Sequence, residues 1–244
     1  MGPSPTLVVI PTAGNTSPVS QPLAHKISDT TRTKRRARTD EDKRQRRETI
    51  LRAADTHFAA AGFEAFSMAE LGKLSGVAKG TLYLYYETRE EVLMALHLAK
   101  LSDWEERMHS RLDSVVSDDD FISALHDTMS EDAAMLRLMS RLDSVIEHNI
   151  SIDTLIAAKR QMAATLSRVA SSLARRLQMT EREAFDVLAG LGSLMIGTCQ
   201  TDAGPRYDDD VLPEDVRTLM QAFSARDLFT VNARRILAGI RGGI

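Results

Sequence analysis

The chain has 244 residues, of which 43% are hydrophobic and 27% are charged, and this length suits one or two domains with ample core. The formal net charge of −3 argues against general affinity for polyanions, although it leaves room for a local basic patch. The single cysteine, Cys199, excludes an internal disulfide framework, and we recognise neither a signal peptide nor a run long enough to span a membrane. We therefore expect a cytoplasmic protein without a membrane partner.

The first 38 residues are predicted to form a disordered tail that ends in a basic arm. Up to about Asp29 the tail is rich in Pro, Ser, Thr and Gly and shows no helical periodicity. Nine Arg and Lys residues then crowd between Arg32 and Arg47. Such a run is either a solvated tail or an arm that contacts nucleic-acid phosphates, and the choice depends on the kind of domain that comes next in the chain.

A first helix is predicted to begin at Thr39 or Asp40 and to end at Gly62. Acidic residues in its first turn suit the helix dipole. Its buried face carries apolar residues at helical spacing, namely Ile50, Leu51, Ala54 and Phe58. We expect this helix to act mainly as a scaffold for the segment after it.

The stretch from residue 66 to residue 93 is predicted to form two short helices joined by a tight turn, followed by a third helix. Ser67 is a suitable N-cap, and Glu70 completes the pattern of a capping box. Gly76 ends the first short helix, because glycine adopts the left-handed conformation without steric cost. The second is expected from Lys79 to Tyr86. Two helices around a short glycine-containing turn are typical of a helix-turn-helix.

This stretch resembles the DNA-binding domain of the TetR family of bacterial transcriptional regulators. The residues that carry the resemblance are Gly62-Phe63, Ser67-x-x-Glu70-Leu71, Gly76-Val77, Lys79-Gly80-Thr81-Leu82-Tyr83-x-Tyr85-Tyr86 and Glu90-Glu91-Val92-Leu93. Met68 and Ala78 depart from the pattern, since family members often have hydroxyl residues there. The resemblance implies an all-α fold, with a helix-turn-helix DNA-binding domain at residues 39–87 and a helical regulatory and dimerisation domain at residues 88–244.

The helix-turn-helix is expected to contact double-stranded DNA in two ways. Phosphate contacts, which set the register, are predicted for Ser67, Lys79, Tyr83 and Arg89. Base contacts, which set specificity, are predicted for Gly80, Thr81 and Tyr85. Leu82 and Tyr86 should pack inward, because they are four residues apart on one helix. Because a DNA-binding motif follows the basic arm in the chain, the arm is expected to make further contacts to DNA through Arg36 and Arg38.

The remainder of the chain is predicted to be helical, so no strand is expected. The expected helices span residues 88–112, 120–130, 131–147, 151–178 and 180–198, and a last helix runs from Pro213 to about Gly242. Asp118, Asp119 and Asp120 should form a loop and an N-cap, and Ser151 or Asp153 should cap the long helix. Thr180 with Glu183 forms another capping box.

Small residues run through the helix at residues 180–198 and alternate there with large apolar ones. Such a helix is apolar nearly all round and has to be buried on several sides. It is either ordinary core or a two-fold interface, and the resemblance favours the interface, since TetR-like regulators dimerise through their last two long helices. The interface residues expected in a homodimer are Leu188, Leu191, Met195, Met220 and Phe223. A two-fold protein implies a palindromic operator.

The resemblance also implies a ligand chamber between the helices of residues 103–178. Its expected lining is Trp104, Met108, Phe121, Met129, Met135, Leu138 and Met139, although Met at helical spacing is also common in cores. Polar contacts to the ligand are expected from His97, His126, His148 and Arg137. The leading hypothesis is a repressor that binds its operator as a homodimer and is released by an unknown small-molecule effector.

Two alternatives remain open at this point. In the first, the chain is a DNA-bound scaffold that recruits a protein partner through its acidic loop at residues 208–215. In the second, the chain is a helical ligand carrier or an enzyme. Glu106-x-x-His109 has the spacing used in di-iron bundles, but those sites need the pattern twice and two further carboxylates. We therefore expect no catalytic residue, no metal and no cofactor, and a location on the nucleoid.

Overall fold

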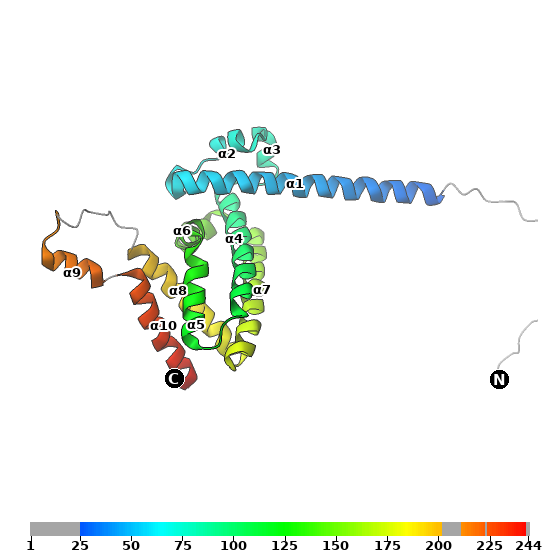
Figure 1. Cartoon of the computed structure of the whole chain (residues 1–244). Coiled ribbons are helices and arrows are strands. Elements are labelled where there is room, and N and C mark those ends of the chain that lie inside the picture. Colours follow the sequence, from blue (N-terminus) through cyan, green and yellow to red (C-terminus); the bar gives the residue numbers. More distant parts are fainter. Residues whose placement is uncertain (1–24, 202–210, 223, 243–244) are drawn as a thin grey trace, which may run out of the picture. The chain divides into compact units, whose positions relative to one another are not determined.

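The computed structural model describes residues 25–201, 211–222 and 224–242, and within them the side chains from Asp40 onward except those of residues 201 and 220–222. All regular elements in these ranges are helical (Figure 1), which confirms the predicted all-α class. The chain divides into two compact units, residues 1–45 and residues 46–244. The domain boundary expected between residues 87 and 88 falls inside the second unit and stays a prediction.

The first helix, α1 (His25–Ala65), begins earlier than the predicted start at Thr39 or Asp40. Arg and Lys are good helix formers, so the basic segment extends the helix upstream of the local capping signal. Residues 1–24 of the expected tail lie outside the described residues. Gly62 has φ 72° and ψ −172°, so it interrupts α1 where the sequence predicted its end.

Three helices follow in the helix-turn-helix segment: α2 (Met68–Ser75), α3 (Lys79–Tyr83) and α4 (Arg89–Leu112). The predicted extent of α3 is wrong at its C-terminal end, because the helix stops three residues before Tyr86. The amides of Tyr85 and Tyr86 both bond to the Leu82 carbonyl, at 3.0 and 3.1 Å, and this shared acceptor closes the helix in a tight turn.

The predicted continuous helix at residues 131–147 is also wrong. The structure has α5 (Asp118–Ser130), α6 (Ala133–Met139), a π-helical turn η1 (Leu142–Ile146) and a 3-10 turn η2 (Glu147–Asn149). Asp132 caps α6 by accepting the Ala134 and Met135 amides. Ser117, and not one of the three aspartates directly after it, caps α5.

The C-terminal helices are α7 (Ile152–Leu177), α8 (Glu181–Thr201), α9 (Glu214–Ala222) and α10 (Ala225–Gly242). Ser151 caps α7 as predicted, and Thr180 and Glu183 form both bonds of the predicted capping box before α8. The expected single last helix is two helices, because Ser224 lies outside both and its carbonyl accepts the Leu228 amide at the start of α10.

Two clusters of buried apolar side chains organise residues 46–244. The first, here called the head core, joins α1, α2 and α3 to the first half of α4, to α6 and to η1. The second, here called the regulatory core, lies among the second half of α4, α5, α7, α8 and α10. Both α4 and α6 contribute to the two cores, since Leu96 and Leu138 lie in the head core while Trp104 and Met135 lie in the regulatory core.

Candidate DNA-binding surface and effector cavity

A hydrogen-bond chain from α1 fixes the entry to α2. The Ser67 amide donates to His57 Nε2 at 3.1 Å, and the His57 ring stacks on Phe66 at 4.8 Å between centroids. Ser67 Oγ accepts the Glu70 amide at 3.3 Å and so caps α2. The predicted capping box is only half formed, because the Glu70 carboxylate pairs with Lys73 at 3.0 Å. Ser67, a predicted phosphate contact, is therefore first of all a structural cap.

The short helix α3 is anchored by one side and exposed on the other. Leu82 is fully buried and Tyr86 is 9% exposed, which confirms that these two residues pack inward. Three predicted DNA contacts share the solvent-exposed side, namely Lys79, Gly80 and Tyr83, while Thr81 and Tyr85 are partly buried beside them. The sequence pattern did not single out Leu84, which is 84% exposed at the end of α3.

Arg47 of the basic segment contacts the turn that follows α3. The guanidinium of Arg47 lies 5.9 Å from the centroid of the Tyr85 ring, a distance suited to a cation–π contact. Burial raises the pKa of the Tyr86 phenol, and the positive charge of Arg47 partly offsets this rise. The side chains of Arg36 and Arg38 lie outside the described ones, so their DNA contacts stay a prediction.

Arg89, another predicted phosphate contact, is engaged inside the protein. Its Nη1 donates to the Phe66 carbonyl at 3.3 Å, and its Nε pairs with Glu90 at 2.7 Å. Its guanidinium also lies 5.0 Å from the Phe63 ring centroid. These contacts tie the start of α4 to the end of α1, which leaves fewer donors for a phosphate than the sequence suggested.

An apolar cavity lies in the regulatory core. It is lined from five helices, by Leu101, Trp104, Leu125, Met129, Met135, Met139, Leu166, Leu188 and Gly192. Its volume of about 40 Å³ has room for only a few water molecules, because one water needs about 10–15 Å³ on this measure. Since ligand sites typically hold about 300–1,000 Å³, an effector has to enlarge the cavity.

Four of the seven predicted lining residues do line this cavity: Trp104, Met129, Met135 and Met139. The other three, Met108, Phe121 and Leu138, are fully buried elsewhere in the two cores. Helical spacing identifies apolar residues that face inward, but it does not tell a cavity wall from a packed core. Sequence reasoning missed Leu101, Leu125, Leu166, Leu188 and Gly192 for the same reason.

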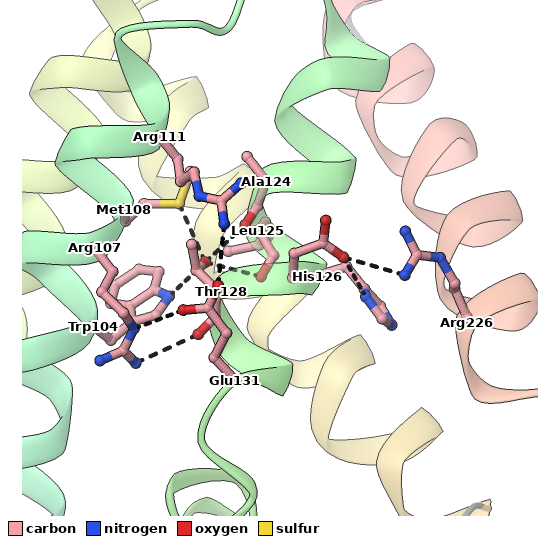
Figure 2. Close-up of polar contacts among 11 residues, drawn as sticks. Trp104, Arg107, Met108, Arg111, Ala124, Leu125, His126, Thr128, Glu131 and Arg226 are labelled. Carbon is pink, nitrogen blue, oxygen red and sulfur yellow. Dashed lines mark hydrogen bonds and ion pairs between the residues drawn. The ribbon is translucent and has the colours of Figure 1, made fainter.

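The buried hydroxyl of Thr128 fixes one wall of the cavity. Figure 2 shows this α5 residue between the side chains of α4 and the helix that carries Arg226. The Trp104 indole Nε1 donates to Thr128 Oγ1 at 3.2 Å, and the Thr128 hydroxyl donates to the Ala124 carbonyl at 2.8 Å. Because the buried indole N–H has a partner, the Trp104 ring is held in one orientation against the cavity.

The structure corrects the expected interface on α8. Leu188, Leu191 and Met195 are at most 4% exposed within one chain, because α8 packs against both α7 and α10. The outward side of α8 instead carries small residues one turn apart, namely Ala189, Ser193 and Gly197. The Met220 side chain and Phe223 lie outside the described parts of the chain.

Metal binding, membrane insertion and the Glu106-x-x-His109 pattern can be compared with the described ranges. There, no group of three or more His, Cys, Asp or Glu residues is arranged to hold a metal ion, and no helix is both long and apolar enough to cross a membrane. Glu106 is exposed, and His109 Nε2 lies 3.6 Å from Glu105 on the same helix. The Glu106-x-x-His109 pattern is thus part of a solvated helix surface.

Comparison with known families gives two matches along the chain. Residues 50–96 match the family described as bacterial regulatory proteins of the tetR family, and residues 98–231 match the tetracyclin repressor-like C-terminal domain. The fatty acid metabolism regulator protein of Bacillus subtilis (strain 168) is 35% identical over 66 residues, which are 27% of this chain and 34% of that protein. The match therefore spans about a third of the length of that relative.

Solved structures of low sequence identity share the fold. Thermus thermophilus FadR, a TetR-family repressor solved in complex with lauroyl-CoA, has a TM-score of 0.51 at 19% identity, over 79% of this chain and 94% of that chain. The fatty acid degradation regulator FadR from Bacillus halodurans has a TM-score of 0.50 at 15% identity, over 81% and 98%. A TetR-family regulator from Mesorhizobium loti has 0.51 at 14%, over 80% and 96%.

Proposed function

The chain belongs to the TetR family of bacterial transcriptional regulators, and from this premise we propose that it is a ligand-responsive repressor which binds a palindromic operator as a homodimer. The observation that carries the proposal is the position of α6. One side of α6 lines the apolar cavity through Met135 and Met139, while its other side joins the head core through Ala134 and Leu138. A change in the cavity therefore acts on the helix that supports the DNA-binding head.

On the DNA side, residues 39–87 form the reading head in this proposal and residues 88–244 form the regulatory and dimerisation domain. Lys79 and Tyr83 contact phosphates, and Thr81 and Tyr85 approach base edges. The exposed Gly80 lets the backbone approach the groove, because it has no side chain. Basic residues upstream, with Arg36 and Arg38 among them, add phosphate contacts that do not depend on sequence.

Contacts between α6 and the head provide the coupling. The Arg137 guanidinium lies 5.9 Å from the Phe58 ring centroid, and the Lys100 ammonium pairs with both Asp55 of α1 and Asp132 at the cap of α6. An effector that enlarges the cavity displaces α6 and so disturbs these contacts. It releases the operator only if it binds more tightly to the displaced state than to the DNA-bound state.

The lining of the cavity indicates the class of effector. All nine lining residues are apolar or glycine, and methionine side chains adapt readily to a new occupant. The Thermus relative was solved with lauroyl-CoA, so a long-chain acyl compound is the first effector that we propose to test. Its acyl chain fits the chemistry of the cavity, although not its present volume.

The homodimer in this proposal uses the outward side of α8 and the neighbouring surface of α10. Ala189, Ser193 and Gly197 allow two helix backbones to approach closely, since their side chains are small or absent. Val231 on α10 is 45% exposed and is the apolar residue of α10 that we assign to this interface. A Cβ added at Gly190 would lie 3.7 Å from Ile236 Cγ2, so α8 and α10 already pack closely within one chain.

The test is to select DNA from a random pool with the purified protein and to measure its release by lauroyl-CoA. We expect enrichment of a palindrome with half-sites about one helical turn apart. Affinity should fall steeply with salt, and deletion of residues 1–38 should flatten that dependence. Failure to enrich any sequence would refute the proposal, and an unchanged salt dependence after the deletion would remove the role of the basic segment.

The small volume of the cavity, about 40 Å³, favours one second candidate. In this alternative the chain stays DNA-bound and a protein partner, not a small molecule, regulates it through the acidic segment at residues 208–215. Residues 208–210 of that segment lie outside the described residues. Release of the operator by an acyl compound would exclude this alternative.

A further inference from the structure

His97 of α4 is buried without a hydrogen-bond partner. The residue is 1% exposed, and neither of its ring nitrogens has a partner within the described part of the chain. Burial lowers the pKa of His97 to about 4, and the positive charge of Lys159 adds to this effect. The ring is therefore neutral at pH 7, and an unpaired buried polar group of this kind lowers stability.

The position of His97 relates it to the apolar cavity. Leu101 and Trp104 follow His97 by four and seven residues, so the three lie on one side of α4, and the latter two line the cavity. On α7, which packs against α4, Lys159 precedes the lining residue Leu166 by the same seven residues. The two helices thus place a polar pair beyond one end of the cavity.

Two methionines pack where the head core and the regulatory core meet. Met139 and Met162 are partly buried and pack against both the head core and the regulatory core. Both side chains are unbranched and flexible, so they can move aside for a ligand at small cost. A ligand that displaces them would extend the 40 Å³ cavity toward His97.

We propose that His97 is the polar anchor of the effector site and takes the oxygen-bearing end of a ligand whose apolar body fills the enlarged cavity. A neutral imidazole has one N–H donor and one nitrogen acceptor. It therefore suits a carbonyl, carboxyl or hydroxyl oxygen at the end of an apolar chain. The inference deepens the proposed function and rests on it, because it concerns the same effector site.

The surroundings of Lys159 suit this assignment. Its ammonium lies 2.6 Å from Glu147 Oε1 and 3.8 Å from Asp143 Oδ1, and its side chain is 47% exposed. Its charge is thus largely compensated by two carboxylates and partly hydrated. Within the described ranges, His97 is then a polar ring with both nitrogens unpaired on this side of the cavity.

The other interpretation of His97 is structural, with a buried water that satisfies the ring. The two interpretations predict opposite effects of the substitution His97→Leu. Removal of an unpaired polar group raises the melting temperature of the ligand-free protein, by about 2–4 °C for a chain of this size. Removal of a ring that is satisfied by water lowers it.

The experiment uses the full chain as wild type, as His97→Leu and as His97→Gln, which keeps one donor and one acceptor. His148→Leu is the matched control, because His148, although predicted from the sequence as a ligand contact, is exposed on η2 and is not among the residues that line the cavity. The probes are decanoic acid, 1-decanol and decanoyl-CoA, which present a carboxylate, a hydroxyl and a thioester on equal chains. Affinities are measured by calorimetry, and melting temperatures are measured without ligand.

We expect at least one probe to bind the wild type, and His97→Leu to weaken that binding about tenfold while His97→Gln restores most of it. His148→Leu should bind like the wild type. If His97→Leu does not fold, His97→Met replaces it with a flexible side chain of similar length.

A loss below about threefold, or wild-type binding of none of the three probes, overturns the inference. A melting temperature that is lowered in both His97→Leu and His97→Met overturns it too. Operator selection with the same wild-type preparation separates this failure from failure of the proposed function. If the operator is bound while the His97 variants bind the probes like the wild type, the inference about the anchor alone is wrong.

Discussion

Replacement of Lys100 by Met tests whether an ion-paired lysine ties the reading head to the cavity wall. The ammonium lies 2.6 Å from Asp55 Oδ1 and 2.9 Å from Asp132 Oδ2, and the Lys100 side chain is 8% exposed. Burial disfavours the charged ammonium, but the hydrogen bonds and charges of the two aspartates outweigh it and raise the pKa of Lys100. Burial likewise opposes the Asp132 carboxylate, yet hydrogen bonds from Lys100 and from the Met135 and Ala134 amides lower its pKa.

The expected loss depends on the exposure of the two carboxylates. Loss of one partner from a buried ion pair costs about 3–5 kcal/mol, because the other charge is left uncompensated. The Asp132 side chain is 22% exposed, so most of this penalty applies to its carboxylate. The Asp55 side chain is 47% exposed, so water compensates part of its charge once Lys100 is removed. We therefore expect Lys100→Met to lower the free energy of unfolding by about 2–4 kcal/mol, or the melting temperature by about 5–15 °C.

The assay is urea unfolding of the single variant and of the double variant Lys100→Met with Asp132→Asn. Asn keeps the cap of α6 but carries no charge, so the double variant should recover much of the loss. A loss below about 1 kcal/mol, or a double variant no more stable than the single one, would refute the reasoning.

The pH dependence of this difference has a definite sign. Since the folded-state pKa of Asp132 is lowered, its contribution is present above the unfolded value of about 3.9 and is lost as the pH falls through the folded value. Since the folded-state pKa of Lys100 is raised, its contribution is present below about pH 10.4 and is lost as the pH rises through the folded value. The stability difference between wild type and Lys100→Met should therefore be constant near neutral pH and should shrink at both extremes.

Three further predictions concern single substitutions, and two of them compare a pair of variants. As the pH falls from 6.5 towards 4, His97 stays neutral in the folded state while it is protonated in the unfolded chain. The free energy of unfolding should therefore fall by about 3 kcal/mol. Urea unfolding of His97→Leu across this range should show a dependence of the free energy on pH that lacks this contribution. Gly76 has φ 64°, so Gly76→Ala should lower the free energy of unfolding by about 1 kcal/mol. Gly80 lies in a helix with open space around it, so Gly80→Ala should raise the free energy of unfolding by up to about 1 kcal/mol. Shifts of the same sign in thermal unfolding would contradict this account. Tyr83→Ala should weaken binding to all operator variants alike, while Thr81→Ala should change which base is preferred in competition binding, and equal losses for both on every sequence would contradict the division of roles.

The helix-turn-helix could be predicted because its signals are local. Ser67 and Gly76 cap or end α2 through contacts within a few residues, and the structure places both in the predicted roles. The spacing of four residues from Leu82 to Tyr86 predicted correctly which side of α3 and of the turn after it is buried. The capping box of α2 closes on one side only, because His57 of α1 accepts the Ser67 amide.

The break after α6 and the identity of the cavity wall could not be predicted, because both depend on tertiary packing. Residues 131–147 have helical periodicity throughout, yet the Ile146 amide bonds back to the Arg141 carbonyl and forms a π-helical turn. Neighbouring residues also diverge, since Leu138 packs in the head core while Met139 lines the cavity. No sequence pattern distinguishes these two positions, which share the same apolar character and lie on one short helix.

The polar residues of α4 explain why a change in the cavity can reach the head. The head core and the regulatory core meet on α4 between Leu96 and Leu101, and this interval carries the buried His97 and Lys100. Loss of a partner from this buried ion pair leaves an uncompensated charge, so a shift that separates the groups is costly. Asp132 then connects the two parts, because it caps α6 through two backbone amides and holds Lys100 with its other oxygen. In the proposed mechanism a displaced α6 weakens the ion pair to Lys100 and with it the attachment of Asp55 in α1, together with the contacts that Leu138 and Arg137 make to the head core.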